Sequence, residues 1–194
     1  MLKYQVAAKL LTQGELVALP TDTVYGIAAK ADDISSVEKL FTLKKRPKFN
    51  PLTICLSDVE DLFNFLENEN DLANVLAKRF WPGALTIVTL VKKEKVHPLI
   101  RAGSDYCGFR IADSDPLRVL IKEVGPIVLP SANISGNQPL IAPSEIKKIF
   151  PGLFVIEGKC NRSSVPSTVI KVDNGITVLR EGKITRLMLD EALK

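Results

Sequence analysis

Histidine and cysteine, which supply many metal ligands and catalytic nucleophiles, are scarce in this sequence. His97 is the only histidine in 194 residues, and it lies in the polar run KKEKVHP, so we interpret it as an exposed loop residue. The three cysteines, Cys55, Cys107 and Cys160, show no CxxC or metal-site spacing, and their odd number argues against a disulfide framework. The sequence therefore predicts no catalytic triad, no metal ligands and a reducing cytoplasm.

Long hydrophobic runs are also missing. The longest, residues 84–91 (ALTIVTLV), includes two threonines and is too short to span a bilayer, so no membrane contact is predicted. Residues 1–14 are typical of an amphipathic helix and not of a signal peptide. Neither GxxxxGK[ST] nor GxGxxG occurs, so a bound nucleotide has to be held by residues dispersed along the chain.

The composition is that of an ordinary globular protein, with 46% hydrophobic and 25% charged residues. The net charge of +4 is a mild basic excess, which suits an anionic small substrate or RNA. Helices are predicted at residues 1–14, 35–44, 58–66, 71–80, 116–124 and 143–150 and after 185. Strands are predicted at residues 15–20, 52–56, 84–91, 107–112, 126–130, 153–157, 167–172 and 176–180. This alternation predicts an α/β or α+β fold with a mixed sheet, in a single domain over residues 1–194.

Five polar clusters lie at predicted strand ends and turns, where open α/β sheets bind ligands. They are residues 20–26 (PTDTVYG), 44–47 (KKRP), 108–112 (GFRIA), 130–136 (PSANISG), and the pair 166–169 (PSTV) with 179–182 (LREG). The first crowds hydroxyl groups and one carboxylate, and is either a ligand-binding turn or a turn stabilised by its own side chains. The second either binds a polyphosphate or complements the dipole at a helix end.

In the third cluster, Arg110 lies within an apolar strand, so its charge needs a partner. That partner is either a carboxylate ligand or an internal ion pair with Asp113 or Asp115. Strand alternation places Tyr106 and Gly108 on the same face as Arg110, and the glycine leaves room beside the guanidinium.

In the fourth cluster, Ser131 and Asn133 either hydrogen-bond a phosphate, ribose or base, or cap a turn. The fifth cluster joins the ends of two strands that form a hairpin through residues 173–175. In that hairpin, Ser167 and Arg180 are expected to face the same cleft.

Taken in order, PTDTVYG, KKRP with a following NPL, WPGALT, GFRIA, PSANISG, PSTVI and LREG resemble the YrdC/Sua5/TsaC family of threonylcarbamoyl-AMP synthases in its short, single-domain form. The resemblance implies a twisted, open sheet flanked by helices, with a concave basic cleft. It implies a nucleotidyltransferase that converts L-threonine, bicarbonate (or CO2) and ATP with Mg²⁺ into threonylcarbamoyl-AMP and pyrophosphate. Transfer proteins then carry the group to tRNA next to the anticodon, and a direct RNA contact is left open.

The same resemblance assigns site residues by motif. Lys44 and Arg46 are implied as the catalytic residues that hold the phosphates. The implied threonine-binding residues are Thr23, Tyr25, Cys55, Arg110 and Ser167. The implied ATP-binding residues are Lys44, Arg46, Asn50, Tyr106, Ser131, Asn133, Ile141 and Arg180.

Two positions depart from the family pattern. Cys55 stands where many relatives have a histidine, which rules out a histidine-dependent proton transfer there. Glu181 replaces the proline of LRPG, which is expected to loosen the turn and keep Arg180. Two rival interpretations remain: an RNA-binding module that uses the same basic cleft, and an adenylate-forming or carbamoyl-transfer enzyme with another co-substrate.

Overall fold

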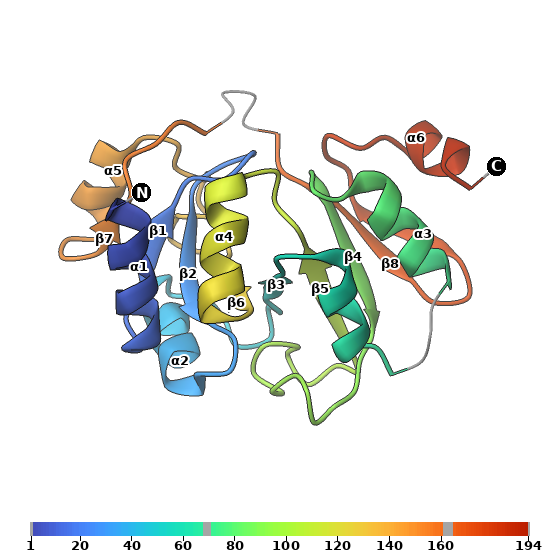
Figure 1. The fold of residues 1–194 in the computed structure, drawn as a ribbon, viewed down its shortest axis with the longest axis horizontal. Helices are drawn as coiled ribbons and strands as arrows, with labels where there is room; N and C mark the ends of the chain where they lie inside the picture. The colour runs from blue at the N-terminus through green and yellow to red at the C-terminus, as the bar shows by residue number, and fades with distance from the viewer. Residues whose placement is uncertain (1, 68–70, 161–164, 194) are drawn as a thin grey trace.

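The structure is a computed structural model that describes residues 2–67, 71–160 and 165–193. Within them, a nine-stranded sheet has the order β7-β1-β2-β6-β3-β5-β4-β8-β9 (Figure 1). The strands are β1 (Val17–Leu19), β2 (Gly26–Lys30), β3 (Thr53–Cys55), β4 (Leu85–Leu90), β5 (Tyr106–Arg110), β6 (Ile127–Val128), β7 (Phe154–Val155), β8 (Thr168–Val172) and β9 (Ile176–Arg180). The helices are α1 (Leu2–Thr12), α2 (Ile34–Leu43), the 3₁₀ helix η1 (Val59–Asn64), α3 (Asp71–Phe80), α4 (Asp115–Val124), α5 (Pro143–Ile149) and α6 (Arg186–Glu191).

The sheet is mixed, as the sequence predicted. Its parallel pairs are β1 with β7, β3 with β5, and β4 with β8. The other neighbouring pairs are antiparallel. The strands β3, β5 and β4 lie side by side in the middle of the sheet, although they come from separate parts of the chain.

Both faces of the first strand are buried. Val17 and Leu19 pack in a cluster with α1 and α4, whereas Ala18 between them belongs to the main core. Helices α1 and α4 lie against each other on this part of the sheet (Figure 1). Burial on both sides explains why residues 15–20 form an apolar run without polar alternation.

Two elements differ from the sequence prediction. Strand β2 was not predicted, because GIAAK contains only one β-branched residue, Ile27. Its pairing with β1 and β6 makes it a central strand. The helix predicted at residues 58–66 is the shorter 3₁₀ helix η1, which Asp58 opens with a capping box through Asp61.

Helix length limits what the chain can do in a bilayer. Among the described residues, we find none that form a helix both long enough and apolar enough to cross a membrane.

The end of the β8–β9 hairpin is held by a close backbone approach at Gly182. A Cβ atom there would overlap the main chain of Pro166, Ser167 and Thr168. By contrast, a Cβ at Gly175, at the hairpin tip, would meet no atom within 4 Å. The two glycines therefore form a matched pair for testing this junction.

Replacing Gly182 with alanine is expected to lower the free energy of unfolding by about 1–3 kcal/mol, because the backbone has to shift to admit the methyl group. Gly175→Ala is expected to leave it unchanged or slightly raised. Chemical denaturation of both variants measures the difference. Equal stability of the two would show that the approach at Gly182 is not tight.

Candidate functional site

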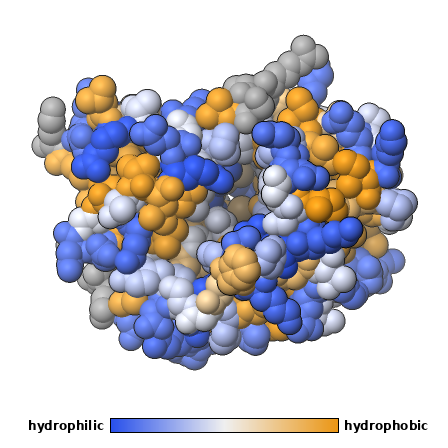
Figure 2. Space-filling view, turned by 180° about the vertical axis from the view of Figure 1, so that it is seen from behind, coloured by the Kyte–Doolittle hydropathy of each residue, from blue (hydrophilic) through white to orange (hydrophobic). Residues whose placement is uncertain are grey.

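A cleft of about 770 Å³ opens over β3, β5, β4 and the start of β8. Its described lining includes four arginines, Arg46, Arg101, Arg110 and Arg180, and no aspartate or glutamate. From behind, the molecular surface is hollowed near its middle (Figure 2). A cleft lined by cations without carboxylates favours an anionic ligand.

The cleft brings together most of the residues that the sequence motifs singled out. These are Thr23, Tyr25, Arg46, Asn50, Cys55, Tyr106, Arg110, Ser131, Ser167 and Arg180. Lys44, Asn133 and Ile141 do not line it. The predicted alternation of Tyr106, Gly108 and Arg110 is confirmed, because all three line the cleft while Cys107 and Phe109 between them lie in the main core.

At one end of β5, Arg110 is held from several sides. Its Nη2 donates to both carboxylate oxygens of Asp22 at 2.7 and 2.8 Å, and its Nε donates to the Gly83 carbonyl at 2.9 Å. Its Nη1 donates to the Thr23 hydroxyl at 3.2 Å. The internal partner is therefore Asp22, and neither Asp113 nor Asp115 is paired with Arg110 in the described structure. The side chains of Arg110 and Asp22 are each only 11% exposed.

Ser167 and Arg180 meet beside Arg110, as the hairpin predicted. Arg180 donates to the Ser167 carbonyl through Nε and Nη2, at 3.2 and 2.9 Å, and Nη2 also reaches the Ser167 hydroxyl at 3.1 Å. That hydroxyl lies 3.0 Å from the hydroxyl of Thr86. Burial and the charge of Arg110 both lower the pKa of Arg180. The side chain of Arg180 is thus fixed despite the missing proline at Glu181.

Two further arginines of the cleft lining, Arg46 and Arg101, lie in loops outside β5. Arg46 donates from Nε to the Asn50 carbonyl at 3.2 Å and from Nη2 to the Pro51 carbonyl at 2.7 Å. Burial lowers the pKa of Arg46. Arg101 donates to the carbonyls of Val96 and Ser104. Both guanidinium groups are anchored by main-chain oxygens. Arg101 also lies 3.9 Å from the carboxylate of Asp105, which Lys93 contacts at 2.9 Å.

Lys44 points away from the cleft and into the turn that carries Ser131 and Asn133. Its ammonium donates to the carbonyls of both residues and to the Asn133 side-chain oxygen. Lys44 is 1% exposed. Burial, with the charge of Arg46 added, lowers the pKa of Lys44 to about 7. In this arrangement Lys44 supports the turn, and Asn133 is used up within it, since its amide also donates to the carbonyls of Ile134 and Asn137.

Two threonine-site candidates have restricted chemistry. The Tyr25 hydroxyl lies within hydrogen-bond distance of the Ile156 and Gly158 carbonyls and accepts from the Gly158 amide, so it ties loops together. Burial raises the pKa of Cys55 to about 12, with Arg110 opposing and Asp22 adding to the shift. The Cys55 thiol therefore stays protonated at neutral pH and serves as cleft wall, neither base nor nucleophile.

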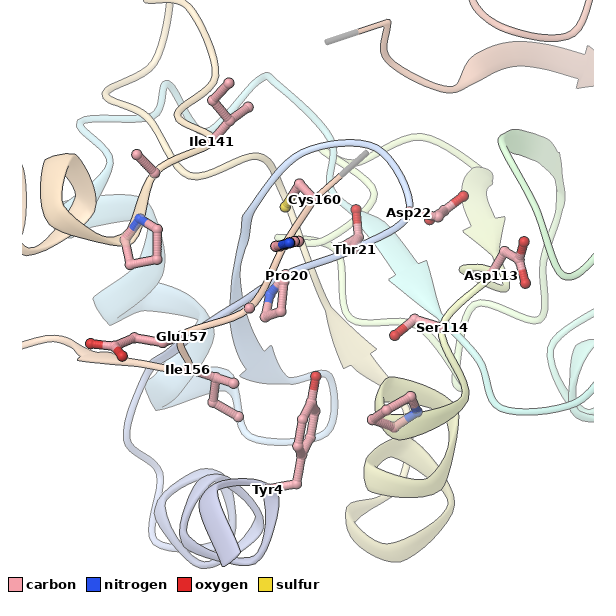
Figure 3. Close-up of a pocket in the computed structure, with 15 residues that line it drawn as sticks. Tyr4, Pro20, Thr21, Asp22, Asp113, Ser114, Ile141, Ile156, Glu157 and Cys160 are labelled. Atoms are coloured by element: carbon pink, nitrogen blue, oxygen red, sulfur yellow. The ribbon is translucent and has the colours of Figure 1, made fainter. Parts of the chain in front are cut away.

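A second cavity of about 980 Å³ lies on the other side of the loop that follows β1 (Figure 3). Asp22 sits on its wall, so the Asp22–Arg110 pair bridges the two hollows. Its described charged lining is mainly acidic: Asp22, Asp113, Glu157 and one lysine, Lys159. Ile141, predicted to pack on adenine, lines this cavity and not the cleft, because residues 141–143 lead into α5.

Sequence reasoning missed three residues of the site. Asp22 was noted within PTDTVYG, but it was not identified as the partner of Arg110. The signal that could have found it is that a buried Arg110 needs a carboxylate nearby. Arg101 gave no signal, because it lies in a loop outside every polar cluster. Thr86 lies in an apolar strand segment and was read only as part of a strand.

Breaking the Asp22–Arg110 pair is expected to be costly. Asp22→Ala leaves a buried guanidinium without its counter-ion and is expected to lower the free energy of unfolding by about 3–5 kcal/mol. Asp190→Ala is the matched control, since Asp190 pairs with Arg186 at 2.9 Å on an exposed helix face. That control is expected to cost about 0.5 kcal/mol or less.

Urea denaturation measures both variants, and the double variant Asp22→Ala/Arg110→Met is expected to recover part of the loss. Equal effects of Asp22→Ala and Asp190→Ala would refute a buried, energetically coupled pair.

Lys44 is expected to give the protein a distinctive pH dependence. Because its pKa is about 7 when folded and near 10.5 when unfolded, the unfolded chain binds the extra proton between these values. The free energy of unfolding therefore rises with pH above about 7, by up to about 1.4 kcal/mol per pH unit. Lys44→Met is expected to remove this component.

Urea denaturation of wild type and Lys44→Met at several pH values from 6 to 9 isolates the lysine, because other titrating groups cancel in the difference. A difference that does not change with pH would mean that Lys44 keeps an ordinary pKa.

Comparison with known proteins adds to this geometry. Residues 9–182 match the family model for Sua5/YciO/YrdC proteins, which is described as telomere recombination. The threonylcarbamoyl-AMP synthase of Bacillus subtilis (strain 168) is 35% identical over 191 residues, which are 96% of this chain and 55% of that protein. The enzyme of the same name from Pyrococcus abyssi is 39% identical over 180 residues, 91% of this chain and 53% of that protein.

Among solved structures, P. abyssi Sua5 complexed with L-threonine superposes with a TM-score of 0.92 and 34% identity. The superposition covers 98% of this chain and 57% of that one. The chain thus spans just over half the length of these relatives. Since the family model matches most of the sequence and its motifs line one cleft, the chain belongs to the Sua5/YciO/YrdC family.

Proposed function

We propose that this chain is an L-threonylcarbamoyladenylate synthase. It would join L-threonine, CO2 (supplied as bicarbonate) and ATP into threonylcarbamoyl-AMP, releasing pyrophosphate. The observation that carries the proposal is the cleft itself, where residues of the family motifs gather with four arginines and no carboxylate among the described lining residues. The names of the two relatives, and the threonine in the P. abyssi complex, support the choice of substrates.

In this proposal, threonine lies at the Arg110 end of the cleft. One N–H of Arg110, on Nη1, is not used by Asp22, Gly83 or Thr23, and it is available for the substrate carboxylate. Ser167 adds a hydroxyl on the same side, and Tyr25 and Cys55 close the wall. An extra methyl group on threonine relative to serine is worth about 1–3 kcal/mol against such a wall.

The nucleotide lies along the rest of the cleft, with Arg46 and Ser131 on its phosphates. Arg180 bridges toward the threonine end through Ser167. The cleft lining offers no carboxylate for a resident metal, and no group of three or more His, Cys, Asp or Glu side chains gathers among the described residues. Mg²⁺ therefore enters as part of the Mg·ATP substrate, held by phosphate oxygens and water.

The chemistry needs alignment and charge neutralisation more than a protein nucleophile. The neutral amine of threonine attacks CO2, forming the C–N bond of a carbamate and releasing a proton. A carbamate oxygen then attacks the α-phosphorus of ATP, and the bond to the departing pyrophosphate breaks. Arginines fixed by main-chain carbonyls supply positive charge without reorganisation as that negative charge moves.

The proposal covers residues 1–194 as one catalytic domain. Its product would pass to proteins that transfer the group to tRNA, and contact with tRNA itself stays open. Three free cysteines suit a reducing cytoplasm.

The deciding experiment incubates the protein with Mg·ATP and bicarbonate, with and without L-threonine, and follows pyrophosphate and nucleotide products by mass spectrometry. A threonine-dependent adenylate that carries the carbamoyl group is expected. Arg46→Ala is expected to lower kcat/KM by about 100-fold or more, because one fixed phosphate contact is lost. Arg118→Ala is the control, since Arg118 also bonds a backbone carbonyl, that of Ser57, but lies on α4 outside the cleft lining.

Other outcomes separate the alternatives. ATP consumption without threonine dependence would favour another co-substrate. Salt-sensitive RNA binding with no ATP turnover would favour the RNA-binding module.

A further inference from the structure

Arg101 is a buried arginine that the proposed reaction has not used. Its side chain is only 8% exposed, yet it lines the cleft. Nε and Nη1 donate to the carbonyls of Val96 and Ser104, and Nη1 lies 3.9 Å from Asp105. Nη2 has no hydrogen-bond partner among the described residues. It is also not among the fully buried atoms that lack a partner, so part of it is accessible. A guanidinium nitrogen in that position has donors to offer to a ligand in the cleft.

Hydrogen bonds link the segment that carries Arg46 to the segment that carries Arg101. Thr53 of β3 pairs with Gly108 of β5, so Pro51, two residues earlier, is level with Tyr106 at the start of β5. Pro51 accepts from Arg46, and the Leu52 amide next to it donates to the Ile100 carbonyl at 2.7 Å. The segments that carry the two arginines are therefore hydrogen-bonded to each other.

The same register separates this pair from the threonine end. Arg110 closes β5, four residues beyond Tyr106, which is about 13 Å along a strand. Arg46 and Arg101 thus form a second cationic centre at the far end of the cleft. A multiply charged anion at this end of the cleft accepts hydrogen bonds from guanidinium donors, and no carboxylate of the described cleft lining competes for them.

We propose that Arg101 is a further anion-binding residue, whose Nη2 contacts the terminal phosphates of the nucleotide and then the released pyrophosphate. This rests on the proposed function only in naming the anion as the polyphosphate of ATP. The alternative is that Arg101 merely ties Val96 to Ser104 in the 96–104 loop, and the test separates these roles.

Isothermal titration of inorganic pyrophosphate with Mg²⁺ into wild type, Arg101→Met and Arg118→Met tests the proposal. Arg101→Met is expected to weaken pyrophosphate binding about tenfold or more, the effect of losing one charge-assisted hydrogen bond. Arg118→Met is expected to bind as wild type does. Titration of L-threonine into the same samples is expected to give unchanged affinity, which shows that the cleft is intact.

Unchanged pyrophosphate affinity in Arg101→Met overturns the proposal and leaves the proposed function standing. Loss of threonine and pyrophosphate binding together assigns Arg101 to the loop alone and also overturns it. Wild type that binds neither ATP nor pyrophosphate refutes the proposed function together with this inference. If Arg101→Met does not fold, Arg101→Gln is titrated in its place and the same outcomes apply. Glutamine keeps a donor for the loop carbonyls and removes the charge.

Discussion

The cleft depends on four guanidinium groups that are held in place by main-chain carbonyls, with no carboxylate in the described cleft lining. Each is anchored by a main-chain carbonyl: Arg46 by Asn50 and Pro51, Arg101 by Val96 and Ser104, Arg110 by Gly83, and Arg180 by Ser167. A carbonyl accepts a hydrogen bond and fixes the orientation of the side chain, but it carries no net charge. Carboxylate anchors would fix the same side chains but cancel the positive field that attracts an anion.

Of the four arginines, Arg110 has the shortest contact with a carboxylate, 2.7 Å to Asp22, whereas Arg101 lies 3.9 Å from Asp105. Asp22 lies on the wall of the second cavity and not in the cleft lining. The pair lowers the cost of burying a charge while Nη1 remains on the cleft side. The loop that follows β1 thus stabilises the Arg110 end of the cleft from behind, and the Asp22 carboxylate offsets part of the positive charge there.

The sequence predicted the parts of this arrangement that are local. KKRP, GFRIA and the hairpin of PSTV with LREG each place an arginine by its own segment, so their patterns were readable. Strand β2 was not, because GIAAK becomes a strand only through pairing on both sides. The place of Arg101 in the cleft was not predicted either, because it depends on a contact between distant segments, the hydrogen bond from the Leu52 amide to the Ile100 carbonyl. Asp22 as the partner of Arg110 likewise depends on a contact across 88 residues.

The basic run at residues 44–46 shows how neighbours in sequence acquire opposite tasks. Lys44 ends α2 and is turned inward, onto the carbonyls of Ser131 and Asn133. Lys45, directly after that helix end, adopts a left-handed conformation with φ of 50°. Arg46 then emerges on the cleft side. Within this basic run, Lys44 is therefore a structural cation and Arg46 is a cation that lines the cleft. Because burial lowers the pKa of Lys44 to about 7, a fraction of the molecules carries only the Arg46 charge at neutral pH.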